Sequence, residues 1–192
     1  PLDEVLAGRL DRFGAIDPSE GGKTIRSTGR LNYHYDATSG GQFFANAYGQ
    51  YYKFDLFTNF TFFLNDPVNG DGIQQSDRRV MYGGDTGWRQ GFDLFGIPSV
   101  VTAGAQARID NAHVRLGTQV TRNPLSPTTD SDVLEASYAP FLKTEFQPTQ
   151  WMRLSGGVRS EVFTFDVQNR CPTCIDQPAG RTTSSIVLPK AN

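Results

Sequence analysis

Between residues 132 and 167, apolar and polar side chains alternate with a two-residue period in two segments, and this pattern is the most informative feature of the sequence. In the first half, the alternate positions are Leu134, Ala136, Tyr138, Pro140 and Leu142. In the second half they are Met152, Leu154, Val158 and Val162, with Arg153, Ser155, Arg159 and Glu161 between them. Successive side chains of a strand point to opposite faces, so the pattern predicts two strands, 132–146 and 151–167, joined by a short link at 147–150.

Weaker alternation elsewhere predicts five more strands, at 24–35, 42–64, 77–89, 99–109 and 184–192. In 24–35, Ile25, Leu31, Tyr33 and Tyr35 share one face. In 42–64, one face carries Phe44, Tyr48, Tyr52, Phe54, Leu56, Phe60 and Phe62, and the other carries Lys53, Asp55 and Asn59. Ile186 and Leu188 mark the last strand. The sequence therefore predicts an all-β chain of about seven antiparallel strands.

The predicted connections alternate in length along the chain. The links at 36–41, 90–98 and 147–150 are short, and those at 65–76, 110–131 and 168–183 are longer. An antiparallel meander sends alternate connections to opposite ends, so short and long links are expected on opposite sides. Outer-membrane barrels have this arrangement, with short periplasmic turns and longer extracellular loops. The apolar faces are then expected to contact lipid and the polar faces to look into the interior.

The composition is compatible with membrane-spanning strands, and it excludes a transmembrane helix and a nucleic-acid-binding protein. No run approaches the 18 or so apolar residues of a membrane helix, and the mean hydropathy is −0.42. The net charge of −2, with scattered Lys and Arg, gives no footprint for nucleic acid. A sheet edge left open in lipid costs several kcal/mol per unpaired group, so about seven strands are expected to be part of a larger barrel.

Several stretches resemble the barrel of TonB-dependent outer-membrane receptors. They are Arg12–Gly22 (RFGAIDPSEGG), Asp55–Asp71 (DLFTNFTFFLNDPVNGD), Gln75–Gly84 (QSDRRVMYGG), Trp151–Val167 (WMRLSGGVRSEVFTFDV) and Leu188–Asn192 (LPKAN). The resemblance covers nearly the whole chain. It implies that residues 1–192 are a partial transmembrane β-barrel domain, a middle portion of a barrel of about 22 strands, with the family's plug domain absent.

The resemblance also implies a function. It predicts a receptor of the bacterial outer membrane that takes up a siderophore, vitamin, metal chelate or saccharide. The expected partners are membrane lipid, the small solute and a TonB-type energising protein acting through the plug, with no nucleic acid. No enzyme activity, catalytic residue, cofactor or metal is expected, and no substrate-binding residue can be carried over. The alternatives are a passive porin and a soluble β-sandwich binding module.

Cys171 and Cys174, in the sequence CPTC, allow three interpretations. A redox pair should open a helix in a thioredoxin-like context, which the flanking residues do not provide. A zinc site needs two more thiol or imidazole ligands, and His34 and His113 are each single and distant in sequence. A loop disulfide, or a purely structural pair, is favoured.

Four other groups of residues suggest sites, each with a plainer alternative. Asp66, Asn69 and Asp71 suggest calcium, but Asn-Gly and Asp-Gly are ordinary turn pairs, which favours a turn. Arg78, Arg79, Asp85, Arg153, Arg159 and Glu161 suggest a cargo channel, although charges inside a barrel more simply pair with one another. Ser126, Ser131 and His113 suggest a hydrolase but lack a nucleophile elbow. The segment from Phe54 to Phe63 suggests either a binding mouth or an interfacial girdle.

Overall fold

The chain folds almost entirely into strands. The computed structural model describes residues 2–174 and 179–191. A short helix, α1 (Leu2–Leu6), precedes seven strands: β1 (Gly21–Asp36), β2 (Gly41–Thr58), β3 (Ile73–Leu94), β4 (Ile97–Val120), β5 (Asn123–Thr149), β6 (Met152–Asn169) and β7 (Gly180–Ala191). Within the described residues, no helix has the length and apolar character needed to cross a membrane.

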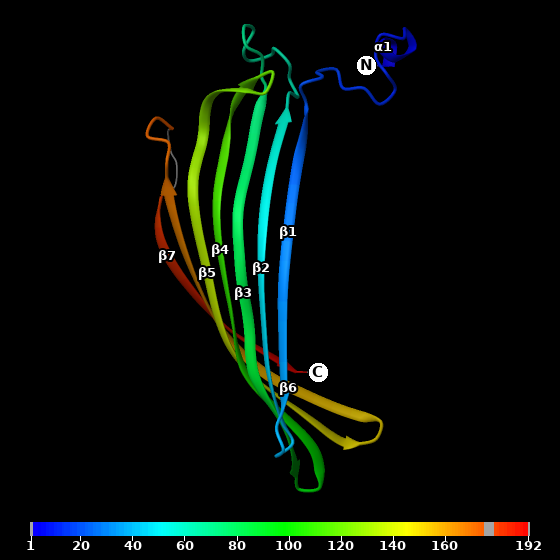
Figure 1. Cartoon of the computed structure of the whole chain (residues 1–192), viewed down its shortest axis with the longest axis vertical. Coiled ribbons are helices and arrows are strands. Elements are labelled where there is room, and N and C mark those ends of the chain that lie inside the picture. The colour runs from blue at the N-terminus through cyan, green and yellow to red at the C-terminus, as the bar shows by residue number, and fades with distance from the viewer. Residues whose placement is uncertain (1, 175–178, 192) are drawn as a thin grey trace.

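The seven strands form one antiparallel sheet in which each strand pairs with its neighbours in sequence. Figure 1 shows a single curved sheet with the turns 37–40, 95–96 and 150–151 at one end. The N-terminal segment, the connections 59–72 and 121–122, and residues 170–174 after β6 lie at the other end, called the loop end below. β1 and β7 are the edges and, in the described part of the chain, do not pair with each other. The all-β, seven-stranded prediction is confirmed, and the open sheet is consistent with part of a larger barrel.

The pairing register places each side chain on one of two faces, because directly paired residues point to the same side. The Arg159 side chain on β6 donates a hydrogen bond to Gln106 on β4. It reaches across β5 above Ala139, which is 1% exposed. Side chains two strands apart meet in this way where the sheet curves toward them. The face of Arg159 and Gln106 is therefore concave, and the opposite face is convex.

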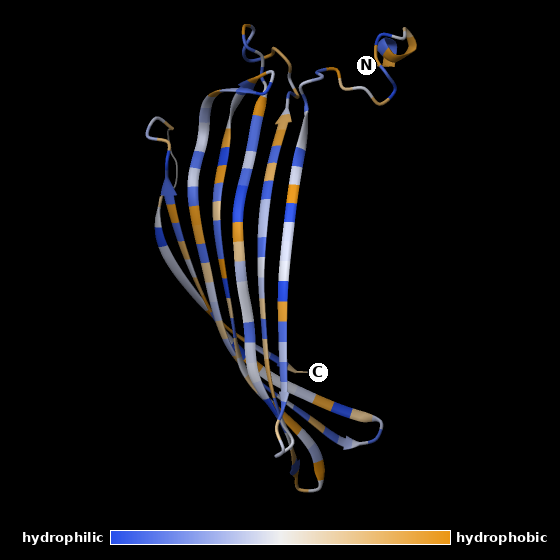
Figure 2. Ribbon diagram, in the orientation of Figure 1, coloured by the Kyte–Doolittle hydropathy of each residue, from blue (hydrophilic) through white to orange (hydrophobic). Residues whose placement is uncertain are grey.

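The convex face carries six successive rows of paired residues without a single charged side chain. We call these rows the uncharged band. From the short-turn end, the rows are Phe92, Ser99, Phe146, Leu154; Gly41, Gln90, Val101, Thr144, Gly156, Ala191; Tyr35, Phe43, Trp88, Ala103, Leu142, Val158, Pro189; Tyr33, Ala45, Thr86, Ala105, Pro140; Leu31, Ala47, Gly84, Ala107, Tyr138, Val162, Ser185; and Gly29, Gly49, Tyr82, Ile109, Ala136, Thr164, Thr183. The alternation that separates the two faces is visible along the strands in Figure 2.

On β2 the expected orientation is wrong. The alternation is present, but Tyr48, Tyr52 and Phe54 lie on the concave face, opposite Arg30, Arg26 and Thr24 of β1. On the convex face, the part of β2 inside the uncharged band contributes Gly41, Phe43, Ala45, Ala47 and Gly49. The register with β1 and β3 therefore decides the face, and the bulkier set of side chains on β2 points inward.

The predicted long loop at 110–131 is also wrong. β4 continues to Val120 and β5 begins at Asn123, so a two-residue turn, Thr121 and Arg122, joins them. Both turn residues have positive φ, 47° and 68°. A tight hairpin turn of this kind normally uses Asn-Gly or Asp-Gly, a signal that Thr-Arg does not give. β4 and β5 have 24 and 27 residues, more than the roughly 9 to 11 that a tilted strand needs to cross a bilayer.

Contacts of Arg122 compensate for this unusual turn conformation. Its backbone N–H donates to Gln119 Oε1 at 2.6 Å. Its guanidinium donates to the carbonyl oxygens of Ser19, at 2.7 Å, and Glu20, at 3.0 Å. The same guanidinium lies 5.3 Å from the centre of the Phe57 ring. Arg122 therefore ties the N-terminal segment to the β4–β5 turn, more than 100 residues away in sequence.

We expect Arg122→Ala to release residues 15–20 from the β4–β5 turn, because the variant loses both side-chain donors. Hydrogen–deuterium exchange of the full-length protein should show faster exchange at 15–20 and at 119–122. Arg12→Ala is the matched control, because Arg12 is exposed, lies 5.8 Å from the adjacent Phe13 ring and, among the described residues, forms no ion pair or side-chain hydrogen bond. Equal exchange in the two variants would contradict the role assigned to Arg122.

Candidate functional site

The concave face holds a connected group of charged side chains centred on Asp110. The residue is 6% exposed, and its Oδ2 accepts a hydrogen bond from Arg108 at 2.8 Å. Arg79 lies 3.9 Å from the same oxygen and binds Asp77 through two hydrogen bonds, at 3.0 and 2.5 Å. Among the described residues, Asp110 Oδ1 is buried without a hydrogen-bond partner. A buried carboxylate with one oxygen unpartnered is well placed to accept a donor from a group inside the barrel.

A second group lies two rows closer to the short turns. The Arg159 guanidinium donates to Glu161 at 3.0 Å and to Gln106. On the neighbouring strands, Asn46 donates to Asp85 at 2.8 Å. Between the two groups is an open hollow of about 480 Å³. It is lined by Tyr48, Asp85, Gln106, Arg108, Glu135, Ser137, Arg159, Glu161 and Phe163, among others.

Aromatic rings border this charged surface. On β2, the Tyr52 and Phe54 rings stack at 6.4 Å between centres, and Arg26 lies 5.1 Å from the Tyr52 ring. On β6, the Phe163 and Phe165 rings stack at 6.2 Å. Flat apolar rings beside paired charges suit contact with a polar solute that also has apolar faces, or with a folded segment inside the barrel.

The structure divides the residues that the sequence suggested as a cargo channel. Arg79, Asp85, Arg159 and Glu161 lie on the concave face, and Arg79 and Arg159 are each ion-paired. Arg153 shares that face by strand parity but lies at the short-turn end, next to residues of the β5–β6 hairpin. Arg78 is on the convex face, paired laterally with Lys53 and His113. The expectation that Arg78 belongs to the channel is wrong.

Sequence reasoning did not single out Asp77, Arg108, Asp110 and Glu135 as site residues. Asp77 is the first residue of the strand predicted at 77–89, which extends from Ile73 to Leu94 in the structure. Arg108 and Asp110 lie on either side of the predicted end of a strand at residue 109. Gln106, Arg108 and Asp110 do follow the two-residue period. Extending that strand past 109 would have placed all three on one face.

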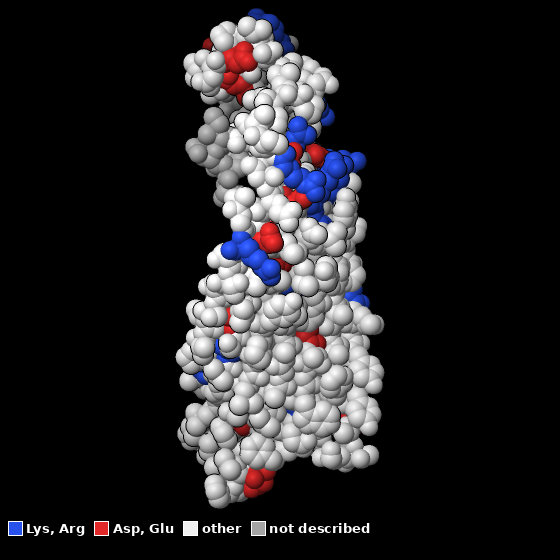
Figure 3. Space-filling view, turned by 90° about the vertical axis from the view of Figure 1, so that its left-hand side faces the viewer, with Lys and Arg blue, Asp and Glu red and all other residues white. Residues whose placement is uncertain are grey.

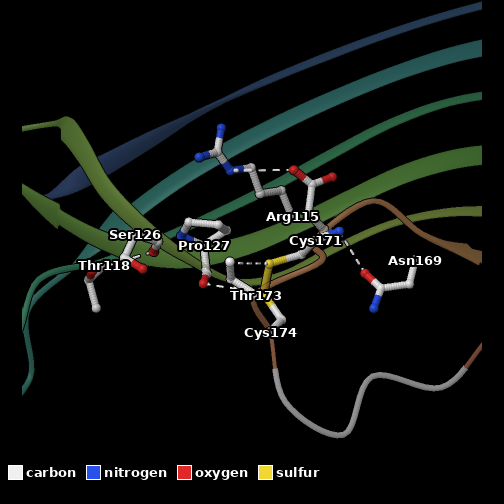
Figure 4. Close-up of a disulfide and its surroundings, with 9 residues drawn as sticks. Arg115, Thr118, Ser126, Pro127, Asn169, Cys171, Thr173 and Cys174 are labelled. Atoms are coloured by element: carbon white, nitrogen blue, oxygen red, sulfur yellow. Dashed lines mark hydrogen bonds and ion pairs between the residues drawn. A yellow bond between two sulfur atoms is a disulfide. The ribbon is translucent and has the colours of Figure 1, made fainter.

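Cys171 and Cys174 are joined by a disulfide in the β6–β7 connection, shown in Figure 4. The Cys171 N–H donates to Asn169 Oδ1 at 2.7 Å, and the Cys174 sulfur lies 3.4 Å from the Pro127 carbonyl oxygen. The Arg170 N–H donates to the Asp130 carbonyl oxygen at 2.8 Å. The disulfide therefore lies against the extended β5 strand, at the loop end of the sheet.

Asp66 and Asp71 serve as hydrogen-bond acceptors within the loop 59–72. Asp71 accepts hydrogen bonds from the Thr61 hydroxyl at 2.6 Å and from the backbone of Asn65 and Asp66. Asp66 accepts hydrogen bonds from the backbone of Val68 and Asn69, both at 2.9 Å. These bonds support the turn interpretation. No cluster of three or more His, Cys, Asp or Glu suited to a metal is present in residues 2–174 and 179–191.

The residues suggested for hydrolysis do not assemble. His113 Nδ1 lies 2.7 Å from Asp132 Oδ1, so a base and an acid are adjacent. Both are on the convex face, whereas Ser131, the neighbour of Asp132 on β5, points to the concave face and is 4% exposed. A nucleophile on the other side of the sheet cannot pass its proton to this imidazole.

The Phe-rich segment divides at the end of β2. Phe54 belongs to the concave face, whereas Phe60 and Phe63 follow the last β2 residue, Thr58, and are 81% and 59% exposed. These two rings therefore lie in the 59–72 loop, beyond the strand.

The chain was compared with protein families and with curated proteins. The family described as "TonB dependent receptor-like, beta-barrel" has a model that matches residues 5–192. A search of curated proteins found no match.

The loop 59–72 gives a pH prediction. Hydrogen bonds from Thr61, and from the backbone of Asn65 and Asp66, hold the pKa of Asp71 below its ordinary value. A lowered folded-state pKa means that the carboxylate orders the loop fully above the ordinary aspartate pKa of about 3.9. This contribution disappears as the pH falls through the lowered pKa. Asp71→Asn should weaken the loop at neutral pH.

Exchange protection of amides 61–71, corrected for intrinsic rates, measures this effect. Asp3→Asn in α1 is the control. The prediction fails if Asp71→Asn leaves protection unchanged. It also fails if the wild-type loop loses protection well above pH 4, where Asp71 is ionised in both the folded and the unfolded protein.

Proposed function

The chain belongs to the family of TonB-dependent receptor-like β-barrels, and from this membership we propose that it forms part of the wall of a receptor that imports a scarce solute through the bacterial outer membrane. Proteins of this family are outer-membrane receptors and transporters. The solute class that we propose is a siderophore, vitamin, metal chelate or saccharide. Energy would come from a TonB-type protein acting through a plug inside the barrel.

The observation that carries the proposal is the size of the uncharged band. On β3 it runs from Tyr82 to Phe92 and on β4 from Ser99 to Ile109, ten residue steps on each strand. At about 3.3 Å per residue and a tilt of roughly 40°, ten steps rise about 25 Å, the height of the apolar band of outer-membrane barrels. Aromatic residues near both limits, such as Tyr82 and Phe92, fit interfacial girdles.

The concave face supports the receptor half of the proposal. Its ion pairs around Asp110 and Arg159 form a polar surface that a plug or a passing solute would contact. Asp110 Oδ1 and Arg159 Nε are buried without partners among the described residues, so the face still offers both an acceptor and a donor. Removing one member of a paired, buried set costs more than removing an isolated surface charge, because it leaves the other unpaired.

Membrane placement predicts different costs for the same substitution on the two faces. In the full-length protein, Leu142→Arg puts a charge in the middle of the uncharged band and should cost about 2 to 4 kcal/mol. Met81→Arg is the matched control on the concave face, where Met81 pairs laterally with Asp110, and it should cost less. Equilibrium unfolding in lipid vesicles measures both, and equal costs would contradict the assignment of faces.

Ion conductance separates a plugged receptor from a passive porin without knowledge of the solute. Full-length protein in a planar bilayer should conduct little, because the family's plug fills the barrel. Deleting the plug-encoding part of the full-length gene should open steady conductance. High conductance of the intact protein would favour the porin instead.

A further inference from the structure

Immediately beyond the uncharged band, toward the loop end, the convex face becomes charged. One uncharged row on β2–β5, Tyr51, Val80, Asn111 and Leu134, is followed by Lys53, Arg78, His113 and Asp132. The next row holds Lys23, Asp55, Ser76, Arg115 and Asp130. We call these last two rows, with Arg170, the charged belt. Figure 3 shows charged side chains gathered toward the loop end, above a broad surface with few charges.

The charged belt contains more cations than its own acids neutralise. Lys53 pairs with Asp55 at 3.5 Å and Arg115 with Asp130 at 4.0 Å, while Arg170 pairs with Asp132. Arg78 is exposed, and in the described part of the chain neither Arg78 nor Lys23 has an ion-pair partner within 4.0 Å. Lys53 and Arg78 are directly paired across the strands. Like charges in that position repel each other unless an anion lies between or above them.

A shallow apolar groove lies beside the belt, within the uncharged band. Its volume is about 720 Å³, and of its lining residues Tyr82 and Ile109 lie in the row nearest the belt. Small side chains form its floor: Ala45, Ala47, Gly84, Ala105 and Ala107. Tyr82 is four residues from Arg78 on β3, about 13 Å along the strand. The groove and the belt lie on β2–β5, each of which is paired on both sides, so additional strands beyond β1 or β7 would not cover them.

We propose that this part of the convex face binds one lipid with a net-anionic, phosphorylated headgroup. An acyl chain lies in the groove, and the phosphate lies between Lys53 and Arg78. Charge complementarity selects the headgroup, because the belt has unpaired cations. The groove selects a chain-bearing ligand over a free anion, because its small residues leave room for a chain against the backbone. The site rests on the proposed membrane placement and assigns a function to the outer surface that solute uptake does not require.

The test uses the full-length protein purified in detergent, with bound lipid counted by native mass spectrometry. The probes are phosphatidylglycerol, phosphatidylcholine with the same chains, and inorganic phosphate. Wild-type protein should retain phosphatidylglycerol in preference to phosphatidylcholine. Arg78→Gln should lower the affinity for phosphatidylglycerol about fivefold, the effect of roughly one basic residue near a charged lipid. Arg12→Gln, outside the belt, should not change it.

A second variant tests the groove independently of charge. Ala107→Trp fills its floor and should lower retention of both lipids, while leaving the fold unchanged because the new ring points into the groove. Equal binding of the two lipids, an Arg78→Gln variant that matches wild type, or inorganic phosphate that displaces phosphatidylglycerol at equal concentration would each overturn the proposal. Dimers that Ala107→Trp disrupts would show that a second copy occupies the groove, which also overturns it.

These results are distinguishable from failure of the receptor proposal. A protein that stays soluble without detergent contradicts the membrane placement itself. A protein that requires detergent but does not distinguish the lipids contradicts only the lipid site.

Discussion

Backbone pairing between neighbouring strands in a fixed register decides which side chains lie on each face of the sheet. Each strand has a two-residue side-chain period, so shifting one strand by a single residue would exchange its two faces. On β3, such a slip would move Arg79 and Asp85 to the convex face and put Asp85 inside the uncharged band. The same slip would break the contact of Arg79 with Asp110 on β4, whereas Asp77, on the same strand, would move together with Arg79. The uncharged rows of the convex face and the ion pairs of the concave face therefore agree with the same register.

The turns help to fix that register, and their chemistry differs between the two ends. At the short-turn end, Phe95 and Gly96 both have positive φ, and the Gly96 N–H donates to Asp93 at 2.6 Å. At the loop end, Thr121 and Arg122 adopt a similar conformation without a glycine. A non-glycine pair held at positive φ persists where surrounding contacts determine it. Here those contacts come from Gln119 and from the N-terminal segment, so the β4–β5 turn depends on a part of the chain far away in sequence.

The sequence predicts the position and orientation of a strand well only where one of its two faces is apolar and the other is polar. β6, and β5 from residue 132 onward, were predicted well because their two faces differ in polarity over most of that length. β2 was oriented wrongly because its concave face is aromatic and its convex face is small, so hydrophobicity alone points to the wrong side. Only cross-strand register resolves this, and register is not visible in a single strand.

The candidate site was less predictable than the fold for a related reason. Arg78 and Arg79 are adjacent in sequence and chemically identical, yet one is exposed on the convex face and the other is paired with Asp77. Their separation follows from strand parity and could have been predicted once the strand was recognised. The partners of Arg79 could not, because Asp110 lies on the next strand in a segment predicted as loop. No strand pattern bears on Cys171 and Cys174. A loop disulfide or a structural pair was favoured there because the sequence provides neither a thioredoxin-like context nor further zinc ligands, and the structure joins the two cysteines.

Arg78 and Arg79 point to opposite faces of the sheet, so β3 carries a cation on each face. On the concave face, Arg108 and Arg159, the two arginines that line the hollow, each have an acid beside them, Asp110 and Glu161, so the lining offers hydrogen bonds without a strong net charge. Outside, the charged belt is incompletely neutralised and lies just beyond the uncharged band, where lipid headgroups would be. β3 thus carries the ion-paired Arg79 on its concave face and, on its convex face, Arg78, which has no ion-pair partner among the residues that the structure describes. Because the two sets alternate along one backbone, a substitution on one face leaves the side chains of the other in place.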